Sequence, residues 1–289
     1  MIVLDGAMGS ELERRGVNTA LPLWSAAALD DAPEVVERIH NEYLAAGAQV
    51  ITANTFRTNV RALAKASIAH RARELTHRAV ALARRAAQAY PPSASALVAG
   101  SIAPVEDCYA PALVPSDDEL LAEHTILANH LAEAGVDLLL VETQNTIREA
   151  VAALRAARAT GKPVWVSFTL NAENHLLSGE PLSEAVRAVL PWQPQAVLVN
   201  CIPVAQVASV VKQLRALVPA HVAIGAYANA GRIDENGQWT MEGGVPPDDY
   251  AKAACEWRAL GATIIGGCCG TTPAHIAALV RQLSGGQSG

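Results

Sequence analysis

Short apolar runs alternate with longer amphipathic segments along the whole chain. Eight runs rich in Val, Ile and Leu predict strands at residues 2–4, 50–52, 97–99, 138–141, 164–169, 196–200, 222–226 and 264–265. Between them, apolar positions recur every three or four residues, which predicts helices at 33–46, 71–89, 117–134, 147–159, 183–190, 204–218, 247–260 and 273–283. The Ala, Leu, Arg and Glu content of these segments also favours helix.

Capping residues mark many of the predicted helix ends. Ser116 with Glu119 has the spacing of a capping box, and Ser183 has a weaker form of the same signal. Pro33 and Pro273 fit the first helical turn. Left-handed C-terminal caps are predicted at four glycines, Gly47, Gly135, Gly161 and Gly261.

Eight alternating strand and helix units, without a linker or composition shift, predict one closed (β/α)8 TIM barrel of the α/β class. The barrel domain is predicted over residues 1–283, followed by a flexible tail at 284–289. A doubly wound open sheet is the alternative. That fold usually has a Gly-rich dinucleotide turn after its first strand, and residues 5–10 (Asp-Gly-Ala-Met-Gly-Ser) match that fingerprint poorly.

Composition narrows the class of protein. The 289 residues are 51% hydrophobic and carry a net charge of −6, which gives no electrostatic reason to expect nucleic acid or an anionic membrane as partner. No apolar run approaches the roughly 20 residues that span a bilayer. Five cysteines, an odd number, do not resemble a disulfide framework. We therefore expect a cytoplasmic protein that acts on small molecules, either as a monomer or as a homo-oligomer.

Three cysteines are placed where a barrel would bring them together. Active sites of such barrels lie at the carboxyl ends of the strands. Cys201 follows the sixth predicted strand, and Cys268 and Cys269 follow the eighth, within Gly266-Gly267-Cys268-Cys269-Gly270. Three thiolates and an open fourth position suit a catalytic zinc, so we predict a Zn²⁺ site at these cysteines. The structural alternative for the cysteine pair is a buried turn or a strained vicinal disulfide.

The remaining two cysteines, Cys108 and Cys255, are interpreted as ordinary small residues.

These motifs resemble the zinc-dependent homocysteine S-methyltransferase family, over essentially the whole chain. The resemblance rests on residues 5–10, 53–56 (Ala-Asn-Thr-Phe), 141–143 (Val-Glu-Thr), 199–201 (Val-Asn-Cys) and 266–270. It implies that Cys201, Cys268 and Cys269 bind zinc and that the sulfur of homocysteine takes the open position.

The resemblance also assigns roles to other residues. It implies that Asp5 and Glu142 hold the amino group of homocysteine, while backbone amides around Gly6 and Ala7 receive its carboxylate. Thr55, in the second-strand motif, is counted with the substrate-binding residues. In cobalamin-dependent relatives an asparagine after the seventh strand ligates zinc before substrate arrives, and Asn229 is the matching residue.

The methyl donor separates the branches of the family. The betaine branch has a tyrosine after the second-strand motif and another after the fourth-strand glutamate, where this chain has Arg57 and Thr143. Corrinoid-dependent synthesis needs further domains or a partner protein. Residues 23–26, residues 227–231 and Trp239 resemble the S-methylmethionine branch instead. Trp24 would contact a sulfonium through a cation–π interaction. We predict S-methylmethionine first and S-adenosylmethionine second, with a betaine- or corrinoid-dependent enzyme as the alternative.

The predicted chemistry is consistent with these residues. A free thiol has a pKa of about 8.5, and zinc coordination deprotonates it. Attack of that thiolate on a sulfonium methyl group neutralises the cation and needs no separate general base. Two other classes stay open: a phosphate-binding barrel lyase or isomerase that uses Gly266 and Gly267, and a non-catalytic zinc or redox sensor. The strand ends offer no lysine for Schiff-base chemistry, which weakens the former.

Overall fold

The chain folds into a closed barrel of parallel strands. The computed structural model describes residues 1–89, 96–233, 239–240 and 243–284. Its eight-stranded sheet has the order β1-β10-β7-β6-β5-β4-β3-β2. The strands are β1 (Ile2–Val3), β2 (Val50–Ala53), β3 (Leu97–Ile102), β4 (Leu138–Gln144), β5 (Val164–Phe168), β6 (Ala196–Pro203), β7 (Ala223–Asn229) and β10 (Ile264–Gly267).

The two ends of this sheet meet. A parallel bridge joins Leu4 to Val50, and Asp5 donates its backbone N–H to the Val50 carbonyl at 2.9 Å, which closes β1 onto β2. The predicted (β/α)8 barrel is confirmed, and the open doubly wound alternative is wrong.

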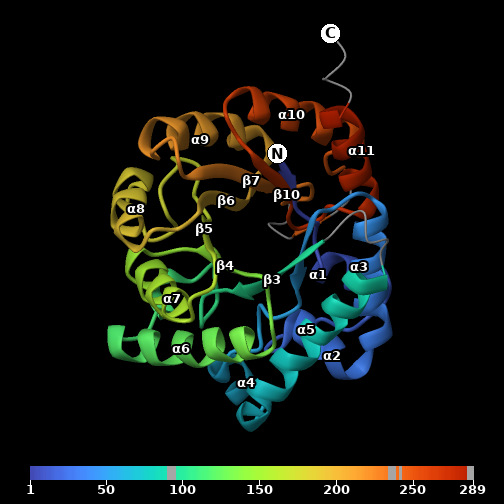
Figure 1. The fold of residues 1–289 in the computed structure, drawn as a ribbon, viewed down its shortest axis with the longest axis vertical. Helices are drawn as coiled ribbons and strands as arrows, with labels where there is room; N and C mark the ends of the chain where they lie inside the picture. Colours follow the sequence, from blue (N-terminus) through green and yellow to red (C-terminus); the bar gives the residue numbers. More distant parts are fainter. Residues whose placement is uncertain (90–95, 234–238, 241–242, 285–289) are drawn as a thin grey trace.

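A ring of helices surrounds the strands (Figure 1). The eight predicted helices are all present, each within two residues of its expected bounds: α3 (Pro33–Ala45), α5 (Ala72–Ala89), α6 (Asp117–Glu133), α7 (Ile147–Ala159), α8 (Leu182–Val189), α9 (Val204–Leu217), α10 (Pro247–Ala259) and α11 (Pro273–Ser284). Ser284 therefore ends α11 and does not begin the tail; the rest of the predicted tail lies outside the described residues. None of the described helices is both long enough and apolar enough to cross a bilayer.

Short elements that the sequence did not predict lie mainly beyond the carboxyl ends of the strands. They are α1 (Gly9–Arg14), η1 (Trp24–Ala27) and α2 (Ala28–Asp31) after β1, α4 (Val60–Lys65) and η2 (Ala69–Arg71) after β2, η3 (Pro111–Leu113) after β3, and the hairpin β8 (Arg232–Ile233) and β9 (Trp239–Thr240) after β7. A further turn, η4 (Leu190–Trp192), extends α8. The insertions before the main helices enlarge the face that carries barrel active sites.

The predicted caps hold with one exception. Ser116 and Glu119 form both bonds of a capping box, and Pro33 occupies the first turn of α3. The four predicted cap glycines have φ between 75° and 106°, a conformation that costs other residues strain. The weak signal at Ser183 was wrong, because α8 already begins at Leu182 and its N-cap is Pro181.

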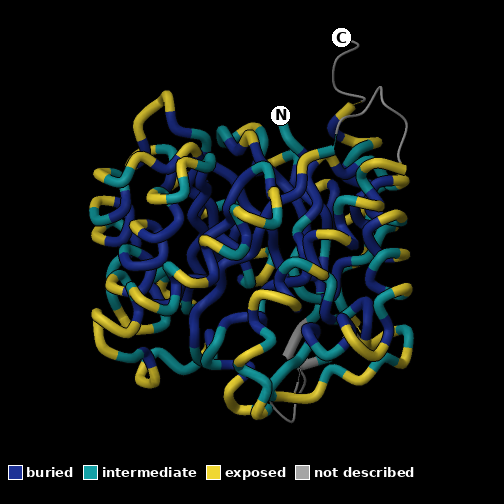
Figure 2. The backbone as a smooth tube through the Cα atoms, turned by 60° about the horizontal axis from the view of Figure 1, so that its bottom comes forward, coloured by how far each residue is buried: buried dark blue, intermediate teal, exposed yellow. Residues whose placement is uncertain are grey.

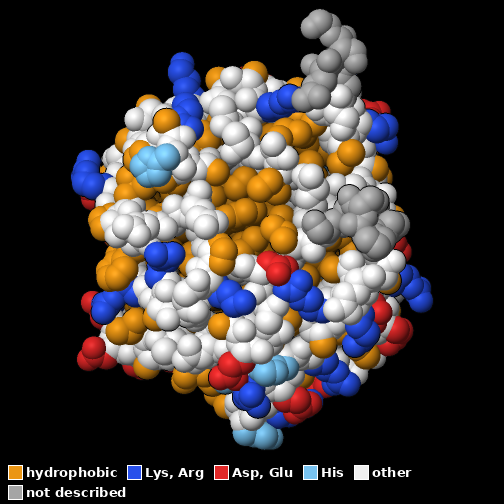
Figure 3. Space-filling view, viewed as in Figure 1, with side chains coloured by type: hydrophobic (Ala, Val, Ile, Leu, Met, Phe, Trp, Pro, Cys, Tyr) orange, Lys and Arg blue, Asp and Glu red, His pale blue; other side chains and the backbone are white. Residues whose placement is uncertain are grey.

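Alternation along the strands creates two apolar layers. On β4, Leu139 and Val141 face the helices, whereas Leu138 and Leu140 join the smaller cluster inside the barrel. Figure 2 shows the resulting burial, with the central strands buried and exposed positions on the outer turns. Figure 3 shows apolar side chains at the middle of the face seen in Figure 1, with charged side chains mostly toward its edge.

Candidate active site

A layer of polar side chains lies above the apolar interior at the carboxyl ends of the strands. The alternation that buries Leu138 and Leu140 also points Glu142 inward. Ser101 donates a 2.5 Å hydrogen bond to Glu142 Oε1, and the Tyr227 hydroxyl donates to Oε2 at 3.2 Å. Asn200 belongs to the same layer and accepts from Ser167 Oγ at 2.7 Å. These side chains come from five successive strands and are at most 8% exposed, so they form a rigid buried network.

Cys201 reaches this layer because β6 is irregular. Val197 and Val199 face the helices, so simple alternation would point Cys201 outward as well. The register between β6 and β7 shifts between Asn200 and Pro203, and Cys201 has a φ of 55°. Such a bulge re-aims a side chain, here into the barrel.

A matching irregularity in β4 stabilises the one in β6. Thr143 has a φ of 57°, and the register of β4 shifts between Val141 and Gln144. Asn200 Nδ2 donates to Thr143 Oγ1 at 2.8 Å, and the Thr143 N–H donates to Asn200 Oδ1 at 3.1 Å. Asn200 thus couples the two bends.

The turn after β10 presents the other two thiols. Cys268 donates its N–H to the Ala228 carbonyl at 2.8 Å, and the Cys269 carbonyl accepts from Ala230 N–H at 2.9 Å. A Cβ on Gly267 would lie 2.2 Å from Thr271 Oγ1, which itself donates to the Cys268 carbonyl. Only glycine leaves room for Thr271 to hold this turn.

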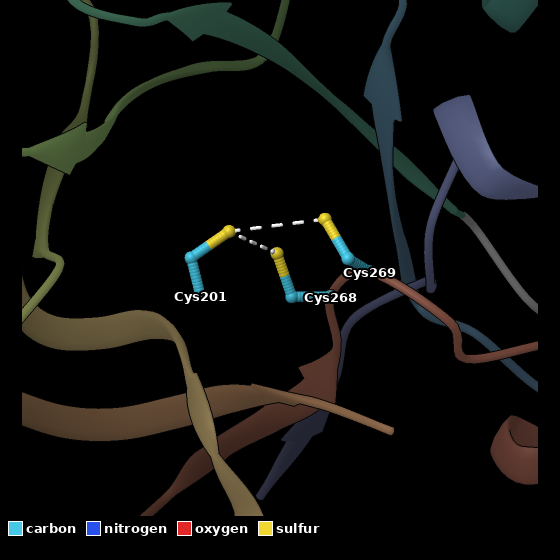
Figure 4. Close-up of side chains that lie close together, drawn as sticks. All are labelled: Cys201, Cys268 and Cys269. Carbon is cyan, nitrogen blue, oxygen red and sulfur yellow. Dashed lines mark hydrogen bonds between the residues drawn. The ribbon is translucent and has the colours of Figure 1, made fainter. Parts of the chain in front are cut away.

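The three sulfur atoms converge, as Figure 4 shows. Cys201 Sγ lies 3.1 Å from Cys268 Sγ and 3.9 Å from Cys269 Sγ, and all three sulfurs fall within 4.8 Å of one another. Tetrahedral zinc with Zn–S bonds of about 2.3 Å separates its sulfur ligands by about 3.8 Å. The 3.9 Å distance matches this separation, whereas Cys201 and Cys268 would have to move apart to bind the ion. All three are free thiols, so Cys268 and Cys269 do not form the vicinal disulfide considered above.

Two buried carboxyl groups lie in the same cavity. Asp5 accepts from Thr52 N–H at 2.7 Å and from Thr52 Oγ1 at 3.1 Å. Burial raises the pKa of Asp5 to about 7 against these hydrogen bonds, with a further contribution from the charge of Glu142. Burial also raises the pKa of Glu142 above its ordinary value, although the bonds from Ser101 and Tyr227 oppose the shift. A cationic ligand would relieve both groups.

The cavity has a volume of about 810 Å³ and brings nearly all the predicted site residues together. Asp5, Gly6, Ala7, Trp24, Glu142, Asn229 and the three cysteines all line it. Thr55 does not line it, contrary to our expectation for a substrate-binding residue. Its buried hydroxyl donates to the Ser101 carbonyl at 2.9 Å, so Thr55 supports the strand that carries Ser101.

Backbone around Gly6 closes one end of the cavity. A Cβ on Gly6 would lie within 2.8 Å of Tyr43 and Thr271, which explains the glycine. The Ala7 N–H already donates to Thr271 Oγ1 at 3.2 Å, and its carbonyl accepts from the Tyr43 hydroxyl at 2.9 Å. The Gly6 N–H has no hydrogen-bond partner among the described residues.

An aromatic wall lines another side of the cavity. Trp24 meets Phe56 edge to face, with ring centroids 5.3 Å apart. Gly9 allows this packing, because a Cβ there would lie 2.2 Å from the indole ring. Trp239, which resembles the S-methylmethionine branch in the sequence, lies in β9. Its side chain is outside the described part of the chain.

Sequence reasoning missed the segment that follows β3. Asp107, Cys108 and Tyr109 all line the cavity, and the Tyr109 hydroxyl lies 3.6 Å from Cys201 Sγ. Cys108, interpreted as an ordinary small residue, is a fourth thiol on the cavity wall, although it lies outside the three-sulfur cluster. Arg57 was also overlooked as a lining residue. The available signal was their position in the loops that follow β2 and β3.

Comparison with known proteins identifies the family. The model of the homocysteine S-methyltransferase family matches residues 2–283. The chain belongs to the homocysteine S-methyltransferase family. It is 36% identical to the homocysteine S-methyltransferase of Escherichia coli over 96% of this chain and 94% of that protein. It is 30% identical to the homocysteine S-methyltransferase YbgG of Bacillus subtilis over 98% and 95% of the two chains.

Solved structures agree with this assignment. The E. coli homocysteine methyltransferase MmuM, in its metallated form, superimposes with a TM-score of 0.84 at 32% identity, covering 98% of this chain and 96% of that one. The protein is therefore a methyltransferase that uses small-molecule substrates, and the predicted family is confirmed. The lyase, isomerase and sensor alternatives are no longer needed.

Proposed function

We propose that the enzyme transfers a methyl group from a sulfonium donor, S-methylmethionine or S-adenosylmethionine, to the zinc-bound thiolate of homocysteine, giving methionine. The observation that carries this proposal is the convergence of three thiols beside two buried carboxyl groups in one cavity. Three sulfur ligands leave a position for a fourth sulfur, and the carboxyl groups match the charge of an amino acid's ammonium group.

The residues fit a zinc ion. Besides the sulfur spacing, Asn229 Oδ1 is buried on the cavity wall and has no hydrogen-bond partner in the described part of the chain. A buried polar atom without a partner is costly, and a ligand role before substrate arrives would satisfy it. When bound, zinc supplies a positive charge that keeps the sulfur of homocysteine deprotonated and nucleophilic.

The acceptor is positioned by this chain's own groups. Asp5 and Glu142 would hold the ammonium group, each already oriented by hydrogen bonds from Thr52 or from Ser101 and Tyr227. The carboxylate would be received by the Gly6 N–H, since the Ala7 N–H is already engaged by Thr271. Positioning the acceptor in this way converts a bimolecular encounter into attack at short range.

The donor would lie against the aromatic wall. A sulfonium near Trp24 gains cation–π attraction worth about 0.5–2 kcal/mol, which the product thioether loses. Transfer breaks the methyl–sulfur bond of the donor and forms one on homocysteine. The electron pair of the broken bond stays on the donor sulfur, so no residue is required as a base for this step.

Methionine formation from homocysteine tests the proposal directly. The zinc-loaded protein would be offered S-methylmethionine, S-adenosylmethionine, betaine and methyl-folate separately, with a chelated control. We expect turnover with a sulfonium donor and its loss on chelation. Turnover with betaine alone, with methyl-folate only after a corrinoid protein is added, or undiminished turnover after metal removal would contradict the proposal.

Binding of the product should depend on pH through Asp5. L-Methionine has an ammonium group but no thiol proton. The pH dependence of its affinity therefore reports on the protein's carboxyl groups and not on ionisation of a ligand thiol. Because the pKa of Asp5 in the free protein is about 7, its charge is lost as the pH falls through that value. We expect the dissociation constant of methionine, measured calorimetrically on zinc-loaded protein, to rise about tenfold between pH 8 and pH 6. Asp5→Asn should flatten this profile, and an equally steep profile in the variant would contradict the assignment.

A further inference from the structure

Arg57 is a buried cation without an anionic partner. It follows β2, lines the cavity and is 8% exposed. Its Nη1 donates to the Glu106 carbonyl at a long 3.3 Å, and its Nε is buried with no hydrogen-bond partner among the residues that the structure describes. No described carboxylate forms an ion pair with it.

Three nearby glutamates, Glu106, Glu119 and Glu123, pair with other cations, and Asp107, on the same cavity wall, accepts from the Tyr109 N–H and forms no ion pair with Arg57. Arg61, four residues further along, pairs with Glu119 at 3.1 Å and with Glu123 at 2.5 Å, while Glu106 pairs with Lys65. A buried charge without a partner is strongly unfavourable in a folded protein. A guanidinium kept in this state on a cavity wall is suited to an anion that arrives with a ligand, and its planar fork matches a carboxylate.

We infer that Arg57 binds the carboxylate of a zwitterionic methyl donor. This inference rests on the proposed function and assigns a binding partner to the carboxylate that S-methylmethionine and S-adenosylmethionine both carry. The guanidinium carbon lies 5.9 Å from the centroid of Phe56, whose ring meets Trp24. The aromatic wall proposed for the sulfonium and the receptor for a carboxylate are thus adjacent. The sulfonium and the carboxylate of one donor are then both matched, while the acceptor's ammonium group is matched separately by Asp5 and Glu142.

The test compares two donors that differ only in the carboxylate. One is S-methylmethionine, and the other is its decarboxylated counterpart, which keeps the sulfonium and the amine. With zinc-loaded full-length protein, we expect kcat/KM to favour S-methylmethionine by about 10- to 100-fold. Arg57→Gln should remove this preference by slowing the carboxylate donor alone, with the KM for homocysteine unchanged. Arg57→Lys should restore part of it. Arg61→Gln, which removes a neighbouring cation outside the cavity, should keep the preference.

Several results would overturn the inference. Equal losses with both donors in Arg57→Gln would indicate a structural role, and a raised KM for homocysteine would assign Arg57 to the acceptor. A binding measurement separates this inference from the proposed function. If no sulfonium donor supports turnover, the proposed function fails, and titration of S-methylmethionine without homocysteine still tests Arg57. Affinity about 10- to 100-fold weaker in Arg57→Gln would support the assignment, and equal affinity would reject it.

Discussion

Cys201→Ala should abolish metal retention and methyl transfer together. The substitution leaves two sulfur ligands in a site whose geometry suits three, and among the described cavity-lining residues Asn229 Oδ1 is the one buried oxygen without a hydrogen-bond partner. Loss of an outer partner of a metal ligand already costs about 10- to 100-fold in affinity or activity, so loss of a ligand should exceed about 100-fold in both. Zinc content after dialysis and the rate of methionine formation are the two measurements.

Two other cysteines supply controls for that experiment. Cys255 lies on α10 and outside the cavity, so the Cys255→Ala variant should keep both zinc and activity. Cys108→Ala should keep zinc, because Cys108 is not part of the sulfur cluster even though it lines the cavity. Stoichiometric zinc with full activity in Cys201→Ala would contradict the metal assignment. Loss of zinc in Cys108→Ala would mean that Cys108 belongs among the zinc ligands, contrary to the assignment.

The sequence predicted much of this site because strand alternation is a local property. Once the barrel was inferred, Glu142, Asn200 and Tyr227 had to lie at strand ends, and their position relative to Leu140 and Leu198 points them inward. The glycines around Cys268 similarly predicted a tight turn. The barrel fold and the convergence of the sixth and eighth strands could therefore be predicted from the sequence.

What the sequence could not show depends on contacts between distant segments. Alternation alone would turn Cys201 toward the helices; the bulge that reverses it rests on Asn200 bonding to Thr143, 57 residues away. Thr55 looked like a ligand because of its motif, yet the contact with Ser101 occupies its hydroxyl. The positions of Arg57 and Tyr109 on the cavity wall depend on which loops meet there, and no local pattern encodes that.

Asp5→Asn should stabilise the substrate-free protein while it weakens homocysteine binding. The folded-state pKa of about 7 lies above the ordinary 3.8, so ionised Asp5 costs stability in the folded state. The contribution of neutral Asp5 to the free energy of unfolding is complete below pH 3.8. It falls as the pH rises from 3.8 to about 7 and is gone above about 7. At pH 8, relief of the buried charge should stabilise the fold by up to about 4 kcal/mol, or about 7 °C in Tm. Asparagine can still accept from Thr52 N–H and donate to Thr52 Oγ1.

The same substitution should raise the KM for homocysteine by about 10- to 100-fold, because one charge-assisted bond to the ammonium group is lost. Asp137→Asn is the matched control. Burial alone would raise the pKa of Asp137, but hydrogen bonds from Arg84 and the Val98 N–H lower it below its ordinary value. That variant should therefore lose stability at pH 8 and keep its KM. A lower Tm for Asp5→Asn would show that Asp5 is held as a structural anion, whereas an unchanged KM would remove it from the acceptor site.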